Sequence, residues 1–106
     1  MDYQDAITAL ADPTRRIIID RLRSGALPVA AIADGMDVSR PAVSQHLRVL
    51  SDAGLLTVKP SGNRRLYAIA PEGIDNLRRY LDTLWDDALA AFARAAEEKA
   101  KEKKDE

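Results

Sequence analysis

Apolar side chains recur three and four residues apart along most of this chain, which is the spacing of one helical face. This pattern predicts five helical segments, over residues 3–11, 13–24, 28–34, 40–53 and 71–96. Asp12 and Ser39 are favourable N-caps, and Pro13 suits a first helical position, as Pro28 does for the third segment. Gly54 is the left-handed residue expected just after the fourth helix.

The period changes to two after residue 55, where apolar and polar side chains alternate. Residues 55–59 and 66–69 therefore predict two short strands, and the turn-forming residues 60–63 between them predict a hairpin. Arg64 and Arg65 would stand at or just after its tip. The predicted fold class is mainly α with a small β-hairpin.

Only a short turn separates the third and fourth helical segments, and the hairpin follows directly. Four helices, two strands and a fifth helix in this order are typical of a winged helix-turn-helix, whose recognition helix enters the major groove of DNA. The plainer alternative is a helical hairpin with a solvated face.

The fourth helix is expected to have two contrasting faces. Val43, Leu47 and Leu50 share an apolar face, with His46 at its edge. The opposite face gathers four residues without an acidic side chain: Pro41, Ser44, Gln45 and Arg48. Short donors and acceptors of this kind read base edges in the major groove, and the absence of carboxylates avoids repulsion by phosphate. His46 either packs at the edge of the core or contacts DNA.

Charge is unevenly distributed along the chain. Residues 1–38 carry a net charge of −2, residues 39–66 carry +4, and residues 67–106 carry −3, which together give the overall −1. A basic patch on an acidic body attracts an anion to one surface. Arg15 and Arg16 lie outside this patch, and either contact phosphate or are simply solvated.

The first and last helices have apolar stripes too wide for one small domain to cover, which predicts a second copy of the chain as partner. Pairing about a two-fold axis would place two recognition helices about 34 Å apart, one turn of DNA. The alternative is packing within one chain. The predicted interface consists of Tyr3, Ile7, Leu10, Leu77, Leu81, Leu84, Trp85, Ala88, Leu89 and Phe92.

Composition excludes several classes of function. The chain has no cysteine and a single histidine, so it lacks thiol chemistry and a zinc ligand set, and we predict no catalytic residue, metal or cofactor. We expect a cytoplasmic protein, because no apolar run is long enough for a membrane span or a signal peptide. Residues 1–96 are predicted to form one domain, and the charged residues 97–106 a frayed or disordered tail.

Three stretches resemble the ArsR/SmtB winged-helix repressors: "LADPTRRIIIDRL", "SRPAVSQHLRVLSDAGLL" and "GNRRLYAI". The likeness covers residues 7 to about 90, with the motifs in the family's order. It implies a homodimeric bacterial repressor that binds an inverted repeat through two recognition helices and pairs through its first and last helices. Metal-sensing members have Cys in the third helix or Asp, His and Glu on the last. This chain lacks such a set and is more similar to the cysteine-free autorepressors of the SdpR-like group.

The prediction is therefore a homodimeric repressor on a double-stranded DNA operator, without metal sensing and with no effector identified. Ser44, Gln45 and Arg48 would read bases, and Arg40, Arg64 and Arg65 would anchor phosphate. The candidate DNA-binding residues are Ser39, Arg40, Pro41, Ser44, Gln45, His46, Arg48, Gly62, Asn63, Arg64 and Arg65. The alternatives are a winged-helix module that binds protein, and a repressor released by a small ligand.

Overall fold

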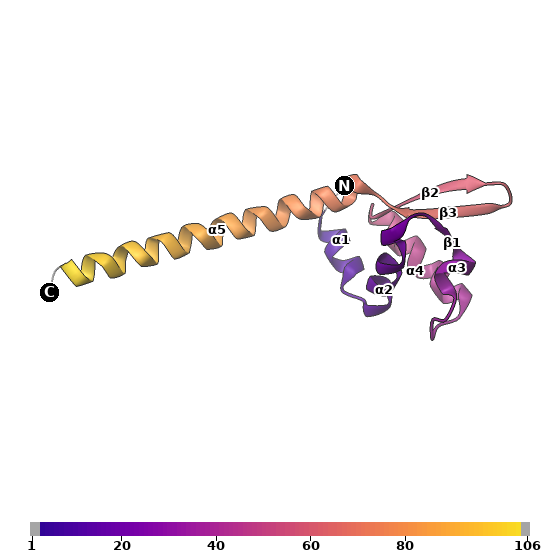
Figure 1. The fold of residues 1–106 in the computed structure, drawn as a ribbon, viewed down its shortest axis with the longest axis horizontal. Coiled ribbons are helices and arrows are strands. Elements are labelled where there is room, and N and C mark those ends of the chain that lie inside the picture. Colours follow the sequence, from indigo (N-terminus) through magenta and orange to yellow (C-terminus); the bar gives the residue numbers. More distant parts are fainter. Residues whose placement is uncertain (1–2, 105–106) are drawn as a thin grey trace.

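The computed structural model describes residues 3–104, which form a small winged domain and one long projecting helix (Figure 1). The elements, in chain order, are α1 (Tyr3–Leu10), α2 (Pro13–Arg21), the 3₁₀ turn η1 (Leu22–Ser24), β1 (Leu27–Pro28), α3 (Val29–Ala33), α4 (Arg40–Asp52), β2 (Leu56–Ser61), β3 (Arg64–Ile69) and α5 (Pro71–Lys104). In the described residues, no helix combines the length and the apolar composition needed to cross a membrane.

The predicted helix boundaries at Asp12, Ser39 and Gly54 are confirmed. Asp12 Oδ1 accepts hydrogen bonds from the backbone N–H groups of Thr14 (2.8 Å) and Arg15 (3.2 Å), which satisfies two free donors at the start of α2. Ser39 Oγ accepts from the backbone N–H of the third residue of α4, at 3.2 Å. Gly54 ends α4 with a φ of 81°, a left-handed conformation that glycine adopts without strain.

The core lies where α2, α3 and α4 meet the base of the sheet. Its completely buried side chains are Ile18, Ile32, Val43, Leu47, Leu50 and Leu55. The apolar face predicted for the fourth helix is therefore the inner face of α4.

The sheet has three antiparallel strands in the order β1-β3-β2, not the predicted two. The hairpin pairs Val58 with Tyr67 and Ser61 with Arg64, and β1 adds Leu27 opposite Tyr67 on the other edge of β3. A strand of two residues is too short to show an alternating pattern, so it could not be predicted from the sequence. It forms because it pairs with β3. The expected start of the third helix at Pro28 is also corrected, because Pro28 closes β1 and α3 begins at the next residue.

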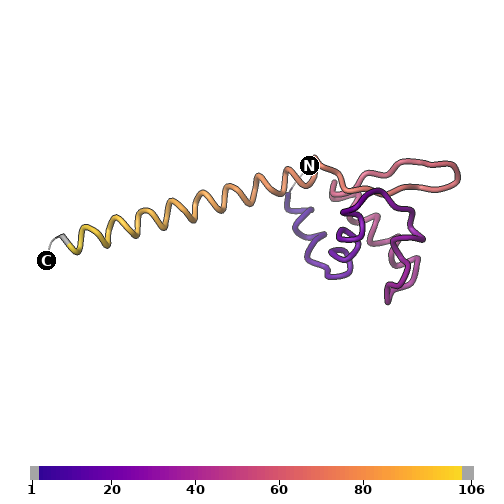
Figure 2. The backbone as a smooth tube through the Cα atoms, viewed as in Figure 1, coloured from indigo at the N-terminus to yellow at the C-terminus, as the bar shows by residue number. Residues whose placement is uncertain are grey.

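Helix α5 extends far beyond the domain. Its 34 residues span about 51 Å, and the molecule measures 74 × 26 × 22 Å. Figure 2 shows the tube leaving the domain directly after β3 and α1 lying beneath only its first part. Tyr3 of α1 stacks on Tyr80 of α5, with ring centroids 4.1 Å apart and planes inclined by 10°.

The helix is longer than the apolar pattern predicted. It continues from residue 97 to Lys104, although a frayed or disordered tail was expected from 97 onward. This stretch consists of Glu, Lys and Ala, which have high intrinsic helix propensity and need no packed face. Residues 1–2 and 105–106 lie outside the described residues, and the division into a domain and a tail stays a prediction.

Candidate nucleic-acid interface

Helix α4 separates its polar and apolar residues as the sequence predicted. Pro41, Ser44, Gln45 and Arg48 are exposed, whereas Val43, Leu47 and Leu50 on the opposite side are inaccessible to solvent. The exposed side therefore presents two short polar groups and a guanidinium on a rigid support.

Helix α3 packs against α4 across the turn of residues 34–39. The Arg21 guanidinium holds the start of this turn, donating to the backbone carbonyl of Ile32 at 2.9 Å and to that of Asp34. Sequence reasoning missed this contact. An arginine in the last turn of α2 was the available signal, but its partners lie 11 and 13 residues away.

The wing is the hairpin of β2 and β3. Gly62, with a φ of 62°, and Asn63 form the turn between the strands, and glycine permits this conformation. Arg64 and Arg65 are the first residues of β3 and are both exposed. Although consecutive strand residues point to opposite faces, both of these arginines line one groove beside α4.

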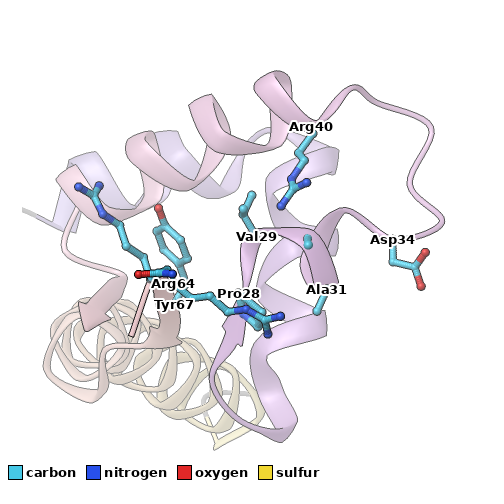
Figure 3. A pocket seen from close by; sticks show the side chains of 10 residues that line it. Pro28, Val29, Ala31, Asp34, Arg40, Arg64 and Tyr67 are labelled. Atoms are coloured by element: carbon cyan, nitrogen blue, oxygen red, sulfur yellow. The ribbon is translucent and has the colours of Figure 1, made fainter. Parts of the chain in front are cut away.

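A groove of about 610 Å³ lies between α3, the start of α4 and the wing. Its lining includes the cationic side chains of Arg40, Arg64 and Arg65. Figure 3 shows Arg40 reaching into this groove from α4 and Arg64 from the wing. Asp34 is the one acidic residue among its described lining, and its carboxylate points outward, away from both arginines (Figure 3).

A second groove, of about 430 Å³, separates α4 from the wing. Ser44 and Arg48 border it on the helix side, and Arg65 and Tyr67 border it on the wing side. Arg65 and Tyr67 thus lie between the two grooves. The structure brings the two candidate sets, the face of α4 and the wing, to one continuous surface.

His46 lies at the edge of this surface, half-buried, with Nδ1 at 3.4 Å from Nη1 of Arg15. Arg15 also donates from Nε to the carbonyl of Ala9 at 2.5 Å, and Arg16 donates to the carbonyls of Leu10 and Ala11 at 2.7 and 3.1 Å. Both arginines therefore bind free carbonyls at the end of α1, a role that neither expectation from the sequence included.

The hydrogen bond from the backbone N–H of Arg15 lowers the pKa of the Asp12 carboxyl below its usual value, against a smaller opposing effect of desolvation. The N–H of Thr14 and the charges of Arg15 and His46 lower it further. Asp12, Arg15 and His46 thus form one electrostatic cluster behind the recognition surface.

The predicted interface residues fall into two groups. Tyr3, Leu10 and Leu77 are half-buried; Tyr3 stacks on Tyr80 of α5, whereas Leu10 packs against the core. The others are exposed in the single chain, with Trp85 at 64% and Phe92 at 74%. No set of three or more His, Cys, Asp or Glu side chains that could hold a metal ion occurs among the described residues.

Comparison with known proteins identifies the family. Residues 10–59 match the family model described as a helix-turn-helix domain. The chain is 50% identical over 86 residues to the HTH-type transcriptional regulator Rv2034 of Mycobacterium tuberculosis, covering 81% of this chain and 80% of that protein. It is 31% identical over 87 residues to the arsenical resistance operon repressor of Staphylococcus xylosus, covering 79% and 84%. The chain belongs to the ArsR/SmtB family. It is thus a DNA-binding transcriptional regulator and not an enzyme.

A solved structure supports the same assignment. The homodimeric winged helix-turn-helix DNA-binding domain of Mb0332 from Mycobacterium bovis is 30% identical, with a TM-score of 0.64, over 79% of this chain and 78% of that one. Its description names it a possible ArsR-family transcriptional regulator.

Proposed function

We propose that this ArsR/SmtB-family regulator is a homodimeric repressor that binds an inverted-repeat operator in double-stranded DNA without sensing a metal ion. The observation that carries the proposal is that the outer face of α4 and the wing border the same groove. Ser44 and Arg48 of α4 line the same groove as Arg65 of the wing. A side chain that reads bases and one that neutralises phosphate are thus available to one duplex at once.

Base reading is assigned to Ser44, Gln45 and Arg48. An arginine can donate both bonds to O6 and N7 of guanine, a glutamine pairs with adenine, and a serine accepts or donates to several edges. All three are exposed on the outer face of α4, whose inner face is locked by buried leucines, so their positions are set by a rigid helix.

Phosphate binding is assigned to Arg40, Arg64 and Arg65, which line one groove beside the start of α4. These contacts would set the register and the strength of binding without selecting sequence. Five further residues of the same surface complete the proposed DNA contacts: Ser39, Pro41, His46, Gly62 and Asn63.

The homodimer is supported by the apolar side chains that α5 exposes beyond the domain. A helix that projects with Trp85 and Phe92 in water is unfavourable, because large apolar surfaces cost free energy when hydrated. A two-fold partner would cover them and duplicate the recognition surface. We also propose that residues 1–96 suffice for both functions and that residues 97–106 are a tail outside them.

The absence of metal sensing, and membership of the SdpR-like autorepressors, are supported by the lack of cysteine in the whole chain. Thiophilic metals need thiolate ligands, and zinc sites need Cys or His in suitable geometry. We assign no effector.

The test is selection of duplexes from a random-sequence library by the purified chain, followed by affinity measurements on the selected sequence and on the promoter of its own gene. We expect an inverted repeat, and an affinity that falls steeply between 50 and 200 mM salt, by about a thousandfold for six phosphate contacts. Added zinc should leave this affinity unchanged. Failure to enrich any sequence at low salt would refute DNA recognition, and release by zinc would refute the metal-free repressor.

A further inference from the structure

Among the described residues of α5, only Gly73 is buried. It stands in the first turn of the helix. A methyl group at this position would lie 1.9 Å from the carbonyl oxygen of Gly54 and 2.8 Å from its carbonyl carbon. Both are backbone atoms, so no side-chain rotation relieves the overlap. The lack of a side chain at Gly73 is what permits this close approach.

The backbone that Gly73 touches is the cap of the recognition helix. The N–H of Leu55 bonds back to the carbonyl of Leu50 at 3.0 Å, and the N–H of Gly54 bonds to that of Ser51 at 3.0 Å. Leu55 itself is completely buried, and its carbonyl accepts from the N–H of Ala70 at 2.8 Å, immediately before α5. One short segment therefore ends α4 and supports the start of α5.

We propose that Gly73 is a positioning residue that fixes the angle between the recognition helix α4 and the projecting helix α5. Two backbones in direct contact leave less freedom than side chains that can change rotamer. Ordinary contact of an added methyl group would require a separation of 3.4 Å in place of 1.9 Å, so the start of α5 would move about 1.5 Å from α4. Because α5 is about 51 Å long, a small rotation at its first turn becomes a large displacement along its exposed stripe.

This inference rests on the proposed function, in which α5 pairs with a second copy and each α4 enters one half-site. The angle at Gly73 then determines the distance between the two recognition helices, and with it the spacing of half-sites that the dimer accepts. Gly73 would thereby influence which operators are bound, although it lies outside the DNA-binding surface.

The experiment uses the full chain and the inverted repeat selected by the wild type, with base pairs removed or inserted between the half-sites. Affinities of the wild type, Gly73→Ala and Ile32→Val are measured by fluorescence anisotropy on each spacing and on a single half-site. Ile32→Val is the control for lost stability, because it creates a small cavity in the core away from this contact.

For Gly73→Ala we expect half-site affinity within about twofold of wild type, and a loss of about tenfold or more at the native spacing, because both sites can no longer be engaged together. Another spacing should become preferred. Ile32→Val should keep the native preference. An unchanged spacing preference in a folded, dimeric Gly73→Ala protein would overturn the proposal.

A second measurement decides the matter if Gly73→Ala does not fold. The chain has no cysteine, so Asp52→Cys and Asp82→Cys, at exposed positions on α4 and α5, allow a spin-label pair to be introduced. In dimers diluted with unlabelled chain, we expect one narrow distance distribution. A broad distribution would show that the angle is not fixed and would overturn the proposal. Because this measurement needs no DNA, it separates failure of the inference from failure of the proposed repressor function.

Discussion

The guanidinium of Arg15 lies 3.4 Å from Nδ1 of His46, which connects the start of α2 to the middle of the recognition helix. An arginine can only donate, so in a hydrogen bond between these two groups Nδ1 of His46 is the acceptor. His46 therefore belongs in part to the support of α4, the first of the two roles that its place at the edge of the apolar face suggested.

The first prediction compares the two adjacent arginines. Arg15→Ala should lower the free energy of unfolding by about 1–2 kcal/mol, because its side chain is only 17% exposed and its loss leaves carbonyl and histidine partners unsatisfied. Arg16→Ala should cost less, since its carbonyl partners are in exposed hydrogen bonds that water can replace. Urea denaturation measures both. Equal losses would contradict the supporting role of Arg15.

The second prediction concerns acid stability. The folded-state pKa of Asp12 is lowered, chiefly by the N–H of Arg15, so its contribution to stability is fully present above the unfolded pKa of about 3.9 and is lost as the pH falls through the folded value. Asp12→Asn retains the cap but does not titrate. Thermal unfolding from pH 6 to pH 3 should therefore show a steeper loss for the wild type than for Asp12→Asn. Parallel curves would refute this assignment.

The third prediction separates base reading from phosphate binding. Arg48→Ala should cost about 1–3 kcal/mol, or about 5- to 150-fold, on the selected operator, because a bidentate contact to a base edge is lost. Its binding to unrelated duplex should change little. Titrations of both duplexes at one salt concentration provide the measurement, and an equal loss on the two would show that Arg48 contacts phosphate.

The fourth prediction concerns the wing. Arg64→Ala should weaken operator and unrelated duplex alike, and the slope of log affinity against log salt should become shallower by about one. The matched comparison is Lys59→Ala, an exposed cation of the wing that does not line the groove between α3, α4 and the wing. A slope unchanged in Arg64→Ala, or a loss confined to the operator, would argue against a phosphate contact.

The sequence allowed prediction of several features that local chemistry determines. Asp12 and Ser39 cap helices through their own neighbours, and the alternation around Val58 predicted a strand that does pair with β3, so both were readable from short windows. The polar face of α4 was readable for the same reason, since helical spacing alone separates Arg48 from Leu47.

Features that depend on distant partners could not be predicted. Strand β1 has two residues and exists because β3 lies beside it, and Arg15 meets His46 across 31 positions in sequence. Gly73 did give a signal, a glycine in the first turn of a long helix, but its meaning requires knowing that Gly54 lies opposite.

The last prediction tests the pairing of α5. Trp85 is the only tryptophan and is 64% exposed in the single chain, so its emission should shift to longer wavelength as a dimer dissociates on dilution. Phe92→Ala should raise the dimer dissociation constant by about tenfold or more, because a large aromatic anchor typically contributes at least 1–2 kcal/mol to an interface. Asp86→Ala, on the polar side of the same helix, should leave it unchanged. Sedimentation equilibrium provides an independent measurement, and a wild-type chain that is monomeric at micromolar concentration would remove the basis for two-fold operator recognition.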